Sequence, residues 1–115
     1  MDKRLIDFNK LKEFLGEDRN VLISFYDLFK EQTKADNILL AKSLDDKDWG
    51  ETASIAHKMK SFFGNIGSEE VFNLLVQIEK NAKESPDYDR MAELFDRYKS
   101  LYSIIIVEFD KYLSQ

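Results

Sequence analysis

Residues that break helices are rare in this chain of 115 residues, which contains one proline and four glycines. The strict alternation of apolar and polar residues that is typical of half-buried strands is nearly absent. Apolar residues instead recur at the spacing of one helical face along most of the chain. Since such a sequence buries its apolar surface only by packing helices together, we expect an all-α protein.

Glycine and acidic residues mark the first two expected helices. A short amphipathic helix over residues 5–15 should end at Gly16, because glycine readily adopts the conformation that closes a helix. A long helix should follow from Asp18 to Leu44, where apolar residues recur at helical spacing on both sides of a polar middle.

The third expected helix begins at a capping box. Asp48 followed three residues later by Glu51 is typical of a helix N-terminus, and this helix should run to Ile66 and be closed by Gly67. Ser68 is expected to cap the fourth helix.

Ser85 is expected to cap the last helix, with Pro86 in its first position. Its apolar stripe consists of Met91, Leu94, Phe95, Tyr98, Leu101, Ile105, Phe109 and Leu113. Four long helices joined by short loops predict an antiparallel up-down-up-down four-helix bundle, with the short N-terminal helix across one end.

Composition limits the classes of function. The net charge of −5 argues against general attraction to nucleic acid or to anionic lipid, and the absence of cysteine excludes disulfides, thiolate catalysis and cysteine-based zinc sites. No apolar stretch approaches the roughly 20 residues that span a bilayer, and the N-terminus lacks the apolar core of a signal peptide. We expect one cytoplasmic, monomeric domain over residues 1–115.

The chain contains a single histidine, His57, on the expected helix 48–66. At about 100° per residue, the apolar residues of this helix fall within about 60° of Met59 and form one core-facing stripe. This stripe consists of Thr52, Ile55, Ala56, Met59, Phe62, Phe63 and Ile66. His57 lies roughly 160° from Met59, so it should face outward.

Small residues surround His57 on the outward face of this helix. They are Gly50, Ala53, Ser54, Ser61 and Gly64, and the tall neighbours are the flexible Lys58 and Lys60. A glycine inside a helix costs about 1 kcal/mol relative to alanine, and close approach of a partner is one reason to keep Gly64. The imidazole should therefore be accessible to another molecule.

The chemistry of an exposed imidazole is narrowed by what the sequence does not place beside it. With no second histidine, no cysteine and no fixed carboxylate expected on this face, His57 is poorly equipped as a metal ligand or triad base. A neutral imidazole accepts a phosphoryl group on a ring nitrogen, and a lysine one turn away, Lys60, is placed to stabilise the phosphoryl oxygens. The competing interpretation is a surface histidine without function.

The stretch "AHKMKSFFGNIG" resembles the signature of histidine-containing phosphotransfer (HPt) domains of two-component phosphorelays. The matching positions are Ala56, His57, Lys60, Ser61, Gly64 and Gly67, with serine at position 61 where the family more often has glycine. The resemblance covers about residues 7–83 by motif and the rest by architecture.

The resemblance implies a stoichiometric phosphotransfer domain and not an enzyme. His57 would accept a phosphoryl group on its Nε2 atom from the phospho-aspartate of one response-regulator receiver domain and pass it to the aspartate of another, within a relay that starts at a hybrid sensor histidine kinase. The domain would need no cofactor of its own, because magnesium would be bound by the receiver.

The resemblance also implies roles for the residues around His57 when a receiver docks. Lys60 would donate to the phosphoryl oxygens and Lys58 would steer an acidic partner. Gln77 could orient the imidazole. The floor of the docking surface would consist of Ala53, Ser54, Ser61, Gly64 and Asn65.

Two other classes of function remain at this stage. A helical scaffold could dock receiver domains without phosphotransfer, but it has no need of a histidine with a lysine three residues later. An enzyme with His57 as general base would need a cleft and an orienting carboxylate, which the small-residue face does not provide.

Overall fold

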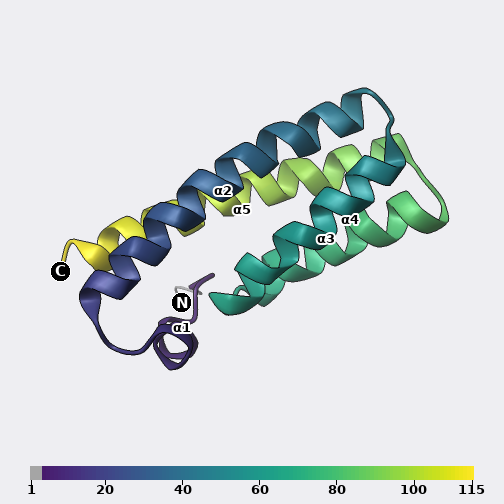
Figure 1. Ribbon diagram of the computed structural model, residues 1–115. Helices are drawn as coiled ribbons and strands as arrows, with labels where there is room; N and C mark the ends of the chain where they lie inside the picture. The colour runs from purple at the N-terminus through teal and green to yellow at the C-terminus, as the bar shows by residue number, and fades with distance from the viewer. Residues whose placement is uncertain (1–3) are drawn as a thin grey trace.

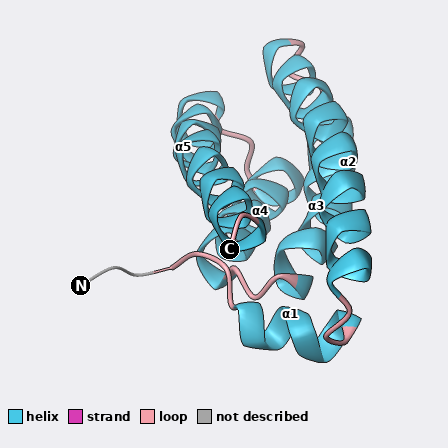
Figure 2. Cartoon of the chain, turned by 90° about the vertical axis from the view of Figure 1, so that its left-hand side faces the viewer, coloured by secondary structure: helices cyan, strands magenta, loops and turns pink. Residues whose placement is uncertain are grey.

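The computed structural model describes residues 4–115 as five helices with no strand among them (Figure 1). The helices are α1 (Phe8–Leu15), α2 (Arg19–Asp45), α3 (Trp49–Asn65), α4 (Glu69–Glu84) and α5 (Tyr88–Leu113). Helices α2 to α5 form an antiparallel bundle that is closed by packing of α2 against α5. Helix α1 lies across one end of the bundle and contacts α3 (Figure 2). The predicted all-α architecture is confirmed.

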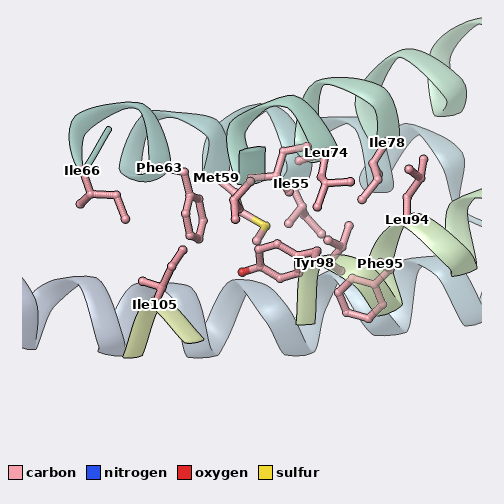
Figure 3. Close-up of a cluster of buried hydrophobic side chains, with 14 of the residues drawn as sticks. Ile55, Met59, Phe63, Ile66, Leu74, Ile78, Leu94, Phe95, Tyr98 and Ile105 are labelled. Carbon is pink, nitrogen blue, oxygen red and sulfur yellow. The ribbon is translucent and has the colours of Figure 1, made fainter. Parts of the chain in front are cut away.

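The core of the bundle is formed by the apolar stripe of α3 and the facing stripes of its neighbours. Figure 3 shows Ile55, Met59, Phe63 and Ile66 of α3 directed toward residues of α4 and α5 that include Leu74, Ile78, Leu94, Phe95, Tyr98 and Ile105. All of these side chains are buried. Because burial of apolar surface is the main favourable term in folding, this face of α3 is held inward and the opposite face is presented to solvent.

The loop between α3 and α4 is a tight helix-closing turn at Gly67. The Gly67 amide donates to the carbonyl of Gly64 at 3.1 Å, and the Ser68 amide donates to the carbonyl of Phe63 at 2.9 Å. This pair of hydrogen bonds is the Schellman motif, and the φ of +71° at Gly67 explains why glycine ends the helix. The turn sets the register in which α4 runs back along α3.

The predicted cap is confirmed at α3 but not at α5, and α2 is capped by Asp18, the residue at which that helix was expected to start. The side chains of Asp18 and Asp48 accept hydrogen bonds from the first turns of α2 and α3. In contrast, Ser85 ends α4, and α5 begins two residues later than predicted, where Asp87 accepts a hydrogen bond from the Arg90 amide at 3.2 Å. Aspartate and serine are equally strong N-caps, but the Ser85 amide still donates to the carbonyl of Asn81 at the end of α4, so the new helix begins after Asp87 and Pro86 stays in the loop.

Two further boundaries differ in detail. Helix α1 begins at Phe8 and not at residue 5, because Asp7 caps it while the amides of Leu5 and Ile6 donate to the carboxylate of Glu108 on α5. Ser68 occupies the N-cap position of α4 as predicted, but its side chain makes no capping hydrogen bond. Among residues 4–115, no helix has both the length and the apolar character needed to cross a membrane.

Candidate functional site

His57 projects from the outward face of α3, and its side chain is 68% exposed. Its Nδ1 atom lies 3.0 Å from Oε2 of Glu79, a residue of α4 whose side chain is only 10% exposed. The expectation that no fixed carboxylate stands beside the imidazole is therefore wrong. That expectation considered α3 alone, whereas the antiparallel packing of α4 brings Glu79 to the level of the ring.

Glu79 is also bound by two lysines. Lys60 Nζ lies 2.6 Å from Oε1 and Lys83 Nζ lies 2.9 Å from Oε2. Burial raises the pKa of Glu79, but the hydrogen bonds and charges of Lys60 and Lys83 outweigh burial and lower the pKa to about 2. Glu79 is thus a carboxylate at neutral pH.

The ionisation of Glu79 determines the tautomer of His57. A carboxylate only accepts hydrogen bonds, so the Nδ1 atom of His57 must donate its proton to Glu79. In the neutral imidazole the other ring nitrogen, Nε2, then carries the lone pair. The geometry presents a nucleophilic nitrogen on an exposed ring that a buried carboxylate orients.

The lowered pKa of Glu79 predicts a specific loss of stability in acid. The carboxylate contributes stability above its ordinary pKa of 4.5, and this contribution is lost as the pH falls toward about 2. We expect the free energy of unfolding of the wild type to exceed that of Glu79→Gln by about 3 kcal/mol near neutral pH. The difference should shrink to near zero at pH 2, as measured by urea unfolding at a series of pH values. Parallel pH profiles for the two proteins would contradict this role of Glu79.

Lys60 and Lys58, the predicted phosphoryl donor and steering charge, both make ion pairs within the domain. The side chain of Lys60 is 21% exposed and is held by Glu79. Lys58 reaches toward α2, where its Nζ atom lies 2.8 Å from Oδ1 of the buried Asp36. Both lysine charges are therefore engaged inside the domain before any partner binds.

The predicted docking residues divide into three groups. Ser54 and Ser61 are exposed beside His57, whereas Gly64 and Asn65 are half-buried. Ala53 is 6% exposed, so its expected place on the accessible floor is wrong: its side chain lies in the contact with neighbouring helices.

Gln77 is exposed on α4, but its side-chain oxygen accepts a hydrogen bond from Arg90 at 3.4 Å. The contact with the imidazole that was considered for Gln77 is made by Glu79 instead.

Sequence reasoning missed Glu79, Lys83 and Asp36. The available signal for Glu79 was its position within the apolar stripe of α4, one turn from Leu75 and from Ala82, where a charged side chain needs a buried partner. The distance along the chain to His57 hid this partnership, because only the α3–α4 turn shows which residues face each other. Residues 4–115 contain no group of three or more His, Cys, Asp or Glu side chains arranged to hold a metal ion.

The fold and this site define a helical bundle that presents one oriented histidine. Comparison with protein families agrees, because the model of the Hpt domain matches residues 24–113. The chain belongs to the Hpt domain family, the histidine phosphotransfer modules of phosphorelays, whose general partners are receiver domains and histidine kinases. No curated protein and no solved structure matches the chain.

Proposed function

We propose that Nε2 of His57 accepts a phosphoryl group from the aspartyl phosphate of one receiver domain and delivers it to the aspartate of another. The observation that carries this proposal is the hydrogen bond from Nδ1 to the buried carboxylate of Glu79, which leaves Nε2 with the lone pair. Family membership supports the class of reaction. The exposure of the ring supports attack on a group held by another protein.

In the proposed step, the Nε2 lone pair forms a bond to phosphorus while the bond between phosphorus and the aspartate oxygen breaks. The aspartate leaves as a carboxylate. The proton on Nδ1 stays in its hydrogen bond, and the negative charge of Glu79 offsets the positive charge that develops on the ring. The return step to a second receiver reverses these changes, so the domain turns over without consuming a cofactor. The receiver supplies the aspartate and the magnesium ion.

Lys60 is proposed to stabilise the transferred phosphoryl group. It lies on α3 one turn from His57, and in the unphosphorylated domain its Nζ atom contacts Oε1 of Glu79, the oxygen that His57 does not use. Turning the flexible lysine side chain from Glu79 toward Nε2 would bring its charge to the phosphoryl oxygens. Glu79 thus holds Lys60 close to the position that the phosphoryl group would occupy on Nε2.

The receiver is proposed to dock over the outward face of α3 and the exposed face of α2 that carries Leu28 and Leu39. Ser54 and Ser61 offer low, exposed contacts beside the ring. Leu28 and Leu39 are exposed on one face of α2, about three turns apart, and add apolar area. Such a surface combines close approach at the reacting nitrogen with apolar contact around it.

Substitution of Gly64 should affect the stability of the fold and the rate of transfer in opposite directions. A Cβ atom at Gly64 would lie 3.6 Å from the ring of Phe72, an ordinary contact, so the fold has room for alanine. We expect Gly64→Ala to raise the free energy of unfolding by about 0.5 kcal/mol and yet to slow phosphoryl transfer, because the methyl group intrudes on the docking surface. Urea unfolding and transfer kinetics measure the two effects. If Gly64→Ala transferred the phosphoryl group at the wild-type rate, Gly64 would not be part of the docking surface.

Incubation with a phosphorylated receiver domain tests the proposed function directly. The protein should acquire a phosphate that is stable in alkali and labile in acid, as expected of a phosphoramidate on histidine. A second, unphosphorylated receiver added afterwards should remove it. Absence of labelling by any receiver of the same organism, or a label that resists acid, would contradict the proposal.

A further inference from the structure

Glu79 uses its two oxygens unequally. Oε1 contacts Lys60 alone, whereas Oε2 contacts both Nδ1 of His57, at 3.0 Å, and Nζ of Lys83, at 2.9 Å. Lys83 and the imidazole therefore share one oxygen atom. The charge that Lys83 places on this oxygen acts directly on the hydrogen bond that orients the imidazole.

Lys83 stabilises the charged form of Glu79, but this role does not require Lys83 to share the oxygen that His57 uses. Lys83 lies one turn after Glu79 on α4 and is 62% exposed, and together with Lys60 it lowers the pKa of the buried carboxyl group. Its significance comes from the buried carboxylate. If Lys60 turns toward an incoming phosphoryl group, Lys83 is the one cation left on Glu79 among residues 4–115.

We propose that Lys83 is a positioning residue that limits how strongly Glu79 holds the Nδ1 proton, and thereby keeps the imidazole of His57 neutral and nucleophilic over a wider pH range. The inference rests on the proposed function of His57 and adds a residue that regulates it. A positive charge on Oε2 weakens the support that Glu79 gives to a doubly protonated ring. Without Lys83, a proton competes more effectively with the phosphoryl group for Nε2.

The other charges near the ring are the same in the wild type and in a Lys83 variant, so they do not compensate for the loss of Lys83. Helix α3 contributes Lys58 and Lys60, and α2 contributes Asp36, which is paired with Lys58. In the described part of α5, no charged side chain makes an ion pair with Glu79. Nζ of Lys83 lies 2.9 Å and Nδ1 of His57 lies 3.0 Å from the shared Oε2 atom, so the two nitrogens are at most about 6 Å apart. At this distance in water, a unit charge changes a protonation equilibrium by about half a pH unit.

Nuclear magnetic resonance tests the proposal without any phosphoryl donor, because His57 is the only histidine and its ring signals are unambiguous. In Lys83→Gln, the pH profile of the ring should move upward by about half a unit, while Lys83→Arg should restore it. The matched control is Lys80→Gln, an exposed lysine of the same helix with no ion pair among residues 4–115, which should leave the profile nearly in place. A wild-type profile in Lys83→Gln, or an equal movement in both glutamine variants, would overturn the proposal.

Transfer kinetics provide the second measurement. Lys83→Gln should accept the phosphoryl group about threefold more slowly than the wild type near pH 6, and this difference should disappear as the pH is raised, because the proposed role of Lys83 acts only through protonation of the ring. A uniform slowing at every pH would indicate a docking defect and contradict the assigned role. A protein that shows the change in ring protonation but takes up no phosphate at all would contradict the proposed function and not the role of Lys83.

Discussion

The substitution His57→Gln is expected to abolish phosphoryl uptake from a phosphorylated receiver to below the limit of detection. A glutamine amide has no nucleophilic nitrogen lone pair, so the bond to phosphorus cannot form, and the chain has no other histidine. The fold should be almost unaffected, because the side chain is largely exposed and Glu79, its partner within residues 4–115, keeps both of its lysines. Radiolabelled transfer from the receiver, followed by gel analysis, measures the loss.

Two controls separate loss of chemistry from loss of docking. The melting temperature of His57→Gln should stay close to that of the wild type, and its affinity for the unphosphorylated receiver should be nearly unchanged. Retained binding with no label would show that the substitution removes the transfer step and leaves docking intact. Persistent labelling of His57→Gln would place the acceptor at another residue and refute the assignment.

Lys58→Ala is expected to destabilise the domain far more than a typical surface substitution. Asp36 is buried, its Oδ1 atom is paired with Lys58, and its Oδ2 atom has no hydrogen-bond partner among the described residues. Removing the lysine leaves a buried carboxylate without its counter-charge. Because Lys58 itself is more than half exposed and water screens the pair, we expect a loss of about 2 kcal/mol, toward the low end for buried ion pairs. Urea unfolding at neutral pH measures this loss.

Matched variants make this prediction specific to Asp36. Lys80→Ala removes an exposed lysine with no ion pair in residues 4–115 and should change stability by less than about 0.5 kcal/mol. The double variant Asp36→Leu with Lys58→Ala should be more stable than Lys58→Ala alone, since no buried charge remains. Equal stability of Lys58→Ala and Lys80→Ala would show that the Asp36 pair contributes nothing.

The ion pairs of Lys58 and Lys60 within the domain change how these two charges contribute to partner binding. The steering role suggested for Lys58 assumed an unpaired charge, but its charge is largely offset by Asp36. Lys60 is likewise bound to Glu79, and under the proposed function it leaves Glu79 only for the transferred phosphoryl group. In the resting site, Lys58, Lys60 and Lys83 are therefore all paired with the two carboxylates Asp36 and Glu79.

Local signals in the sequence were sufficient for the helices and for the face that His57 occupies. The scarcity of glycine and proline, the aspartate caps at residues 18 and 48 and the turn at Gly67 act over a few residues, so they are readable along the chain. The apolar stripe around Met59 determined which side of α3 is buried, and this required only the helical period. The misplaced start of α5 shows where local signals compete, since Ser85 and Asp87 are both good caps.

The partners of His57 were decided by the tertiary structure. Glu79 is distant from His57 in sequence, and the contact depends on the register that the Gly67 turn imposes on two antiparallel helices. The same holds for Asp36, which meets Lys58 only across the contact between α2 and α3. The sequence by itself determined that a histidine stands on the open face of a helix. Only the packing of α4 against α3 supplied the physical reason why Nε2, the nitrogen that the family resemblance implies, keeps its lone pair, because hydrogen bonding depends on distance in space.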